Sequence, residues 1–172
     1  GHWGLVPKLQ KLAIDNKIEA YNLPQGCLAH MLRDAGAHKP RTISRVGLGT
    51  FIDPRNGGGK INTKTTEDLV ELIQFDGRDY LAYKTQAIDV AIIRGTTADT
   101  DGNITMEKEA LTLESLSLAI AAKNNDGFVI VQVERIAGKG MLRPQTYWLK
   151  QFDGKIEQDF IGRFENLQND YS

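Results

Sequence analysis

Apolar residues recur at helical spacing in three stretches of the chain. Leu5, Leu9 and Leu12 are separated by three and four residues, and Pro7 stands where the first turn of a helix tolerates proline. This pattern predicts a helix over about 5–16. The other two helices are predicted over these ranges: 24–36, opened by Pro24-Gln25-Gly26, and 113–123.

Other stretches alternate apolar and polar residues, or run continuously apolar, as β-strands do. Residues 69–84 form two such stretches around Asp76-Gly77, a dipeptide that favours a two-residue hairpin turn. The runs 88–93 and 128–133 are almost entirely apolar, which is expected of strands covered on both faces. Three shorter strands are also predicted: 18–22, 44–47 and, after a turn over 99–103, 104–106.

Helices that alternate with apolar strands predict an α/β domain with a mostly parallel central sheet. A β-hairpin and a short carboxyl-terminal strand and helix, supplied by apolar residues from Trp148 to Leu167, would be added to it. Ligands bind such sheets at loops that leave the carboxyl ends of strands. Two loops follow predicted strands here, one containing Gln25 and one running from Gly47 to Asn62. We therefore expect a site at these two loops.

Composition and charge are those of a single globular domain. The chain has 172 residues, of which 41% are hydrophobic and 25% are charged. A formal net charge of −1 gives no broad attraction toward nucleic acid, and no apolar run approaches the roughly 18 residues that cross a membrane. A single cysteine, Cys27, fits a reducing compartment, so a cytoplasmic location is expected. The chain opens without a methionine or a signal-like segment, as expected of part of a longer protein.

The stretch GLGTFIDPRNGGGKIN, from Gly47 to Asn62, is called the glycine loop below. Ordering this loop costs much backbone entropy, because its five glycines have the most conformational freedom to lose. A chain usually keeps such a loop where the backbone comes close to a ligand, with amides exposed and a cation, here Lys60, at the end. A flexible surface linker is the alternative, but Phe51, Ile52 and Pro54 are too apolar and stiff for one.

Two nucleotide-binding patterns are absent from the glycine loop. The spacing GxGxxG fails because Ile52 stands where the third glycine would be, and no GK[ST] sequence occurs at Lys60. A nucleoside triphosphate enzyme is therefore not favoured. The phosphates of another ligand, held by Arg55, Lys60 and free amides, remain an open alternative.

Gln25 stands between Pro24 and Gly26 at the predicted junction of a strand and a helix. A side-chain amide beside the unpaired amides of a helix start can stabilise a developing oxyanion. A solvent-facing residue that tolerates the first turn fits the same pattern, and the residues alone leave both interpretations open. Cys27 is expected to be a small buried side chain, because no base is paired with it. No cluster of His, Cys or carboxylate residues predicts a metal site.

Five segments carry a more specific pattern, in order over about 1–136. The segments are GHWG (1–4), NLPQG (22–26), GLGTFIDPRNGGGKIN (47–62), YLAYK (80–84) and AIIRGTTADTDGNIT (91–105). Together they resemble family I coenzyme A transferases of the acetate/propionate or short-chain acyl type. The resemblance implies a three-layer α/β/α domain, with residues 1–137 as part of the family's first domain.

The resemblance implies that coenzyme A is exchanged from a thioester onto a free carboxylic acid. A glutamate attacks the acyl-CoA, and an acyl anhydride and then a glutamyl-CoA thioester form with ping-pong kinetics. Gln25 of the PQG motif would help to form the oxyanion hole. The acyl-CoA is a substrate, and no cofactor, metal, nucleic acid or membrane partner is expected. The residues expected beside substrate and coenzyme A are Gly26, Gly49, Thr50, Asp53, Gly57, Gly58, Gly59 and Lys60.

The chain also departs from the family pattern. The nucleophilic glutamate belongs to a glutamate-glycine signature in a second domain, and that signature does not occur here. Glu107, Glu109, Glu114 and Glu134 lie in the body of the first domain and are not candidates. The chain alone is therefore expected to be inactive, and a carboxyl-terminal coenzyme A transferase domain or a second copy is the expected partner.

The segment 138–172 is expected to be a divergent tail that packs on the same domain. Its pieces RPQTYWL (143–149) and DFIGRFENLQNDY (159–171) resemble the carboxyl-terminal part of carbohydrate-type sulfotransferases, without that family's sulfonucleotide-binding loops. Two other functions thus stay open. The chain could be a non-catalytic structural or assembly module, or a chimera, that keeps relic motifs, or it could be a sulfotransferase-related protein.

Overall fold

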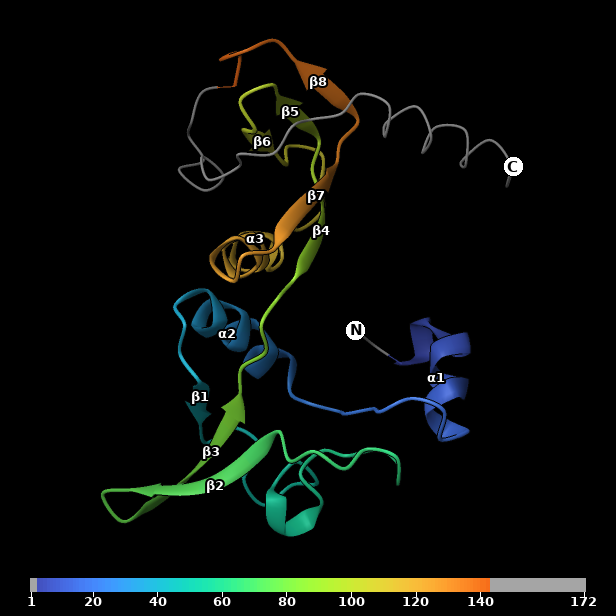
Figure 1. Ribbon diagram of the computed structural model, residues 1–172, viewed down its shortest axis with the longest axis vertical. Helices are drawn as coiled ribbons and strands as arrows, with labels where there is room; N and C mark the ends of the chain where they lie inside the picture. The colour runs from blue at the N-terminus through green and yellow to red at the C-terminus, as the bar shows by residue number, and fades with distance from the viewer. Residues whose placement is uncertain (1–2, 143–172) are drawn as a thin grey trace. The chain divides into compact units, whose positions relative to one another are not determined.

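The computed structural model describes residues 3–142, which fall into two compact units (Figure 1). Of the described residues, 3–35 and 39–86 belong to the first unit, and 36–38 and 87–142 belong to the second. The predicted strand and helix of the tail, with Trp148, lie outside the described residues. Within the described residues no helix is both long and apolar enough to cross a membrane.

The helices of the first unit lie close to where the spacing predicts them. A 3-10 helix, η1 (Trp3–Leu5), precedes α1 (Pro7–Ile14), which has Pro7 in its first turn. The second helix, α2 (Gln25–Gly36), begins directly after Pro24. The strand predicted at 18–22 is wrong, because only Tyr21 makes an isolated antiparallel bridge, with Lys60 of the glycine loop.

Three antiparallel strands form the sheet of the first unit, in the order β1-β3-β2. The strands are β1 (Arg41–Ser44), β2 (Val70–Phe75) and β3 (Arg78–Lys84). The hairpin prediction is confirmed: Phe75 pairs with Arg78, and Asp76 and Gly77 have φ of 48° and 71°, as a type I′ turn requires. Strand β1 ends where the strand at 44–47 was predicted to begin, because the chain turns there and the Leu48 amide donates to the Arg45 carbonyl at 3.3 Å.

One face of this sheet and α2 form the core of the first unit. Successive residues of a strand point to opposite faces, so Leu81 and Tyr83 are fully buried, whereas Ile43 and Phe75 on the other face are exposed. The buried side chains of this core come from α2, the glycine loop, the residues before β2 and the sheet: Cys27, Met31, Ile52, Leu69, Val70, Leu81 and Tyr83. The burial predicted for Cys27 is confirmed.

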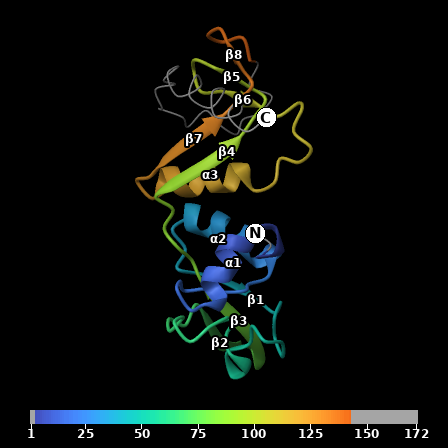
Figure 2. The same ribbon diagram turned by 90° about the vertical axis from the view of Figure 1, so that its right-hand side faces the viewer.

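The second unit has two small sheets and one helix. Strands β4 (Val90–Arg94) and β7 (Phe128–Gln132) pair in parallel, and α3 (Ser115–Asn124) lies along one face of the pair (Figure 2). A further sheet has the order β6-β5-β8, in which β5 pairs antiparallel with β6 and parallel with β8. Its strands are β5 (Thr97–Asp99), β6 (Ile104–Thr105) and β8 (Arg135–Ala137).

The α/β class is confirmed, and the strand pairing is more mixed than predicted. The helix at 113–123 and the strands at 104–106 and 128–133 are confirmed, whereas β5 and β8 were not predicted. Strand β4 was expected to be covered on both faces. In the described residues the face toward α3 is covered, and the other face is not: Val90 and Ile92 on that face are 41% and 72% exposed.

Candidate functional site

The glycine loop is an ordered turn built around three consecutive left-handed residues. A 3-10 helix, η2 (Pro54–Asn56), is followed by Gly57, Gly58 and Gly59 with φ of 119°, 65° and 75°. Residues other than glycine rarely adopt such values. Gly58 and Gly59 are also buried. The glycines are therefore explained by the path of the backbone.

The carboxylate of Asp53 holds the loop together from inside, and the side chain is fully buried. Its Oδ1 accepts hydrogen bonds from the Arg55 amide at 3.1 Å and from Arg55 Nε at 2.9 Å. Its Oδ2 accepts from the Gly49 amide at 2.9 Å and from Arg55 Nη2 at 2.6 Å. The hydrogen bonds from the Arg55 side chain, and then from the Gly49 amide, hold the pKa of Asp53 well below its usual range. Both oxygens are thus occupied by the loop itself.

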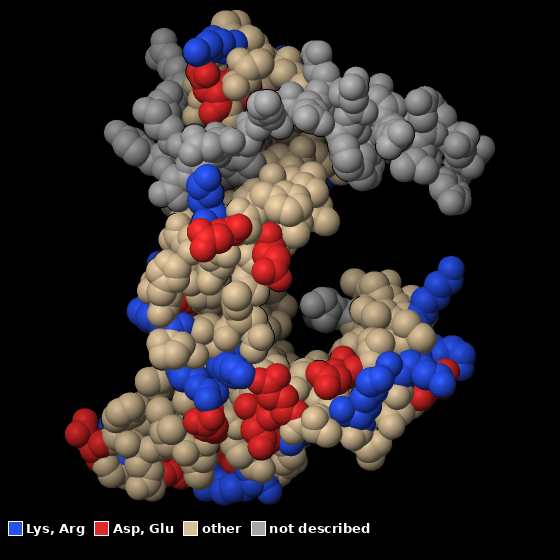
Figure 3. Space-filling view, in the orientation of Figure 1, with Lys and Arg blue, Asp and Glu red and all other residues tan. Residues whose placement is uncertain are grey.

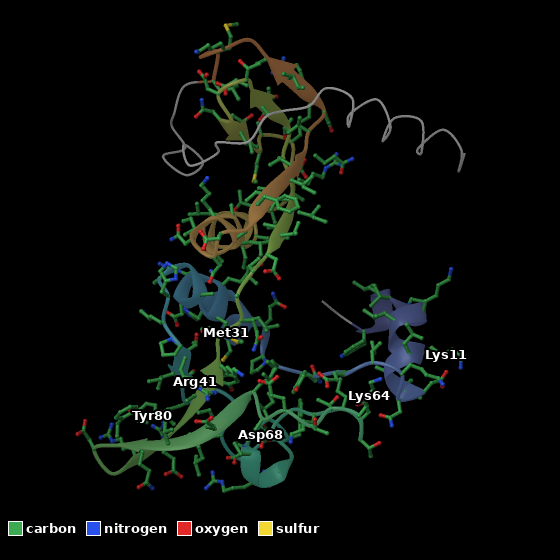
Figure 4. The ribbon with its side chains drawn as sticks, viewed as in Figure 1. Lys11, Met31, Arg41, Lys64, Asp68 and Tyr80 are labelled. Atoms are coloured by element: carbon green, nitrogen blue, oxygen red, sulfur yellow. The ribbon has the colours of Figure 1, made fainter. Side chains whose placement is uncertain are left out.

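The glycine loop was expected to expose backbone amides, but the last four amides before Ile61 are hydrogen-bonded within the loop. The amides of Gly57, Gly58, Gly59 and Lys60 donate to carbonyls of the same loop at 3.4, 3.1, 3.0 and 3.3 Å. They point inward because three left-handed residues in a row wrap the chain back on itself. The cation at the end of the loop, Lys60, is paired: its Nζ lies 2.6 Å from a carboxylate oxygen of Asp68, a residue that is labelled in Figure 4.

Gln25 lies exposed at the first position of α2. The first amide of α2 with a helical hydrogen bond is that of Leu28, which donates to the carbonyl of Pro24, the residue before the helix, at 3.0 Å. The three preceding amides, from Gln25 to Cys27, have no intrahelical partner, as at any helix start. A Cβ added at Gly26 would meet nothing within 4 Å, so the start of α2 is open.

The end of the glycine loop packs against the residues that lead into Gln25. The Asn22 amide donates to the Gly59 carbonyl at 2.8 Å, and the Ile61 amide donates to the Ala20 carbonyl at 3.0 Å. A Cβ added at Gly59 would lie 2.9 Å from the Asn22 carbonyl oxygen. The two loops that the sequence singled out therefore lie side by side in the first unit.

The predicted site residues divide by exposure. Gln25 and Gly26 at the helix start are exposed, as are Gly49, Thr50 and Gly57 in the loop. Asp53, Gly58 and Gly59 are buried, and Lys60 is half-buried in its ion pair. The exposed set can face a ligand, whereas the buried set can only shape the loop.

Tyr83 supports the loop and was missed by the sequence analysis. Its hydroxyl donates to the Val46 carbonyl at 2.5 Å. A Cβ added at Gly47 would lie 2.7 Å from the hydroxyl oxygen of Tyr83. Burial, and then the neighbouring Cys27, raise the pKa of Tyr83 above its usual range. No local signal could have found this residue, because the contact joins positions far apart in the sequence.

Charged side chains of both signs lie on the first unit, and the described part of the chain holds no cluster of metal ligands. On the face drawn in Figure 3, acidic and basic side chains are interleaved over the first unit. Among residues 3–142, no group of three His, Cys, Asp or Glu side chains is arranged to hold a metal ion.

Comparison with known proteins decides the family. The coenzyme A transferase family matches residues 1–152. The chain belongs to the coenzyme A transferase family. It is 49% identical over 146 residues to the acetate CoA-transferase YdiF of Escherichia coli K12, and 51% identical over 144 residues to the caffeate CoA-transferase of Acetobacterium woodii. These matches cover 85% and 84% of this chain but 28% of each relative, so the chain spans little more than a quarter of their length.

A solved structure agrees with the fold. The crystal structure of the acyl-CoA transferase YdiF of E. coli O157:H7, in a thioester complex with CoA, superposes with a TM-score of 0.81 at 50% identity. The superposition covers 83% of this chain and 28% of that one.

The comparisons correct the interpretation of the tail. The coenzyme A transferase match continues through residue 152, past Ala137, where the sequence analysis ended the family pattern. The piece at 143–149 falls within this match. The resemblance of the tail to sulfotransferases is therefore not supported.

Proposed function

We propose that this chain supplies the oxyanion side of an acyl-CoA:carboxylate coenzyme A transferase of the acetate/propionate class. One observation carries the proposal: Gln25 is exposed at the open start of α2, directly after residues that the glycine loop packs against. Similarity to an acetate CoA-transferase supports a carboxylic acid of the acetate/propionate class as the acceptor of coenzyme A.

The chemistry needs hydrogen-bond donors where negative charge develops. When a carboxylate attacks the thioester, the carbonyl oxygen becomes an oxyanion, and preorganised donors stabilise it. The side-chain amide of Gln25 and the adjacent amide of Gly26 are such donors, and the helix start adds a positive partial charge. The attack forms an acyl anhydride and releases the thiolate of coenzyme A. The thiolate then attacks the glutamyl carbonyl of the anhydride, which gives a glutamyl-CoA thioester and releases the original acyl group as its free carboxylate. We assign the attacking glutamate to sequence outside these 172 residues.

The other site residues would have different roles according to whether they are exposed or buried. Gly49, Thr50 and Gly57, which are exposed, would lie along the acyl-CoA. Asp53, Gly58 and Gly59 would hold the loop in place beneath it. Lys60, paired with Asp68, would contribute through the shape of the loop more than through free charge.

The experiment is a transfer assay with acetyl-CoA and labelled propionate. The chain alone is expected to give no labelled propionyl-CoA. The completed enzyme, meaning this chain combined with a polypeptide that carries the remaining coenzyme A transferase sequence and its glutamate, is expected to give product with ping-pong kinetics. Transfer by the chain alone would show that the nucleophile lies within it.

A binding measurement separates this function from a non-catalytic module. Calorimetric titration of the completed enzyme with coenzyme A should give saturable binding and no competition by adenosine 3′,5′-bisphosphate at equal concentration. If this chain were a module with relic motifs, Gln25→Ala would leave the binding and transfer of coenzyme A by the completed enzyme unchanged. Equal binding of both compounds would show that the adenosine end alone is recognised, and it would contradict a site built around the thioester.

A further inference from the structure

We infer that Gly59 is a positioning residue for Gln25. Because position 59 lacks a side chain, the glycine loop can close against Asn22 and Leu23 and fix the start of α2. This inference rests on the proposed role of Gln25, although its main test does not depend on activity.

The loop and the segment before α2 form one hydrogen-bonded unit. Asn22 donates its amide to the Gly59 carbonyl at 2.8 Å, and Tyr21 and Lys60 form an antiparallel bridge at the same place. Gly59 is itself anchored, because its amide donates to the Phe51 carbonyl at 3.0 Å. The end of the loop therefore provides a fixed support for the residues that follow Tyr21.

Asn22 and Leu23 lie too close to Gly59 for position 59 to carry a side chain. An added Cβ would lie 2.9 Å from the carbonyl oxygen of Asn22 and 3.1 Å from Cδ2 of Leu23. The first contact is with backbone, which cannot rotate away as the end of a side chain can. Leu23 packs against the core of the first unit, so it has little room to yield.

A displacement at Asn22 and Leu23 would reach Gln25 directly. Only Pro24 stands between Leu23 and Gln25, and the proline ring fixes one of its two backbone dihedrals. A shift of a few tenths of an ångström at the contact would thus move the first turn of α2. The donors that we assign to the oxyanion would move with it.

The variant Gly59→Ala needs a control for backbone strain, because φ at position 59 is 75°. Gly77 provides the match: its φ is 71°, and a Cβ added there would meet nothing within 4 Å. It lies in the hairpin turn, outside the candidate site. Gly59→Ala and Gly77→Ala therefore carry similar strain, but only the first adds a contact with the segment before Gln25.

The test records amide spectra of the ¹⁵N-labelled 172-residue chain. In Gly59→Ala, the backbone resonances of Gln25, Gly26 and Cys27 and the side-chain amide of Gln25 are expected to shift. In Gly77→Ala they are expected to stay in place while those of the hairpin shift. Unchanged resonances at Gln25 in a folded Gly59→Ala chain would overturn the inference.

A second variant covers the case in which Gly59→Ala does not fold. Leu23→Ala removes the side chain that a Cβ at position 59 would approach to 3.1 Å, so Leu23→Ala is compared with Leu23→Ala/Gly59→Ala. The Asn22 carbonyl still meets the added Cβ in the double variant, so the Gln25 resonances should shift between the two. If they do not, the inference is overturned.

Kinetics of the completed enzyme then connect position to function. Gly59→Ala should lower kcat by about 10²-fold with little change in KM, as expected when a reacting geometry is misplaced, and Gly77→Ala should not change it. Shifted Gln25 resonances together with an unchanged kcat would leave the positioning inference standing and would contradict the proposed role of Gln25.

Discussion

At the scale of single residues, the glycine loop is shaped by one buried carboxylate. Asp53 accepts hydrogen bonds from Gly49 and Arg55, and Arg55 also reaches Asp79 of β3 at 3.4 Å. A carboxylate removed from water in this way must stay ionised and paired, since an unpaired buried charge is costly. Protonation of Asp53 at low pH is therefore expected to destabilise the glycine loop.

The variant Asp53→Asn tests that response. The pKa of Asp53 in the folded chain lies below its ordinary value of 3.8, so its charged form stabilises the fold above that pH. This contribution is lost as the pH falls through the lower folded value. Urea unfolding at a series of pH values gives the free energy of unfolding of wild type and of Asp53→Asn. The difference between the two should be largest near neutrality and should shrink below about pH 4. A difference that stays constant down to pH 2 would contradict the assigned role.

The hydroxyl of Tyr83 gives a second prediction at this scale. Tyr83→Phe removes the hydrogen bond to the Val46 carbonyl and should lower the free energy of unfolding by about 1 kcal/mol. Tyr80→Phe, on the opposite face of the same strand, is the matched control and should change it by less than about 0.5 kcal/mol. Equal losses for both variants would show that the Val46 contact contributes nothing.

The sequence singled out two loops that lie together in the structure, but it did not predict the contacts within them. It singled out Gln25 and the glycine loop, and the structure places the two side by side. It predicted exposed amides in the glycine loop, whereas the amides of Gly57 to Lys60 bond within the loop. The direction of these amides depends on three consecutive left-handed dihedrals, and composition alone does not specify them.

At the scale of elements, local signals were reliable and long-range pairing was not. The hairpin was predicted because Asp76-Gly77 encodes its own turn. The segment 18–22 has the composition of a strand, but its partner is a loop, so it forms only a single bridge. Strands β5 and β8 are three residues each and pair across a large separation in the chain, which no local pattern indicates.

The hairpin turn supplies a prediction of its own. Gly77→Ala should lower the free energy of unfolding by about 1 kcal/mol, because alanine is strained at a positive φ. Asp76→Asn should be nearly neutral, because asparagine adopts the left-handed conformation readily. Chemical denaturation of the two variants checks both. A larger loss for Asp76→Asn would contradict the type I′ turn.

At the scale of the whole molecule, the chain is a coenzyme A transferase domain that spans little more than a quarter of its full-length relatives. Segments such as the glycine loop identified this family from sequence, because a long, unusual string of residues is specific. The likeness of the tail to sulfotransferases is not supported, because the pieces at 143–149 and 159–171 are short and the coenzyme A transferase match continues to residue 152. The transfer reaction is accordingly proposed for the completed enzyme.

The most direct test of the account is the rate of coenzyme A transfer by the completed enzyme with Gln25→Ala. Gln86→Ala, an exposed glutamine between β3 and β4, is the matched control. Loss of one oxyanion donor is expected to lower kcat by about 10²–10³-fold, with KM for the acyl-CoA nearly unchanged, and the control should match wild type. If Gln25→Ala and Gln86→Ala transfer coenzyme A at the same rate, Gln25 does not stabilise the oxyanion and the proposed site is wrong.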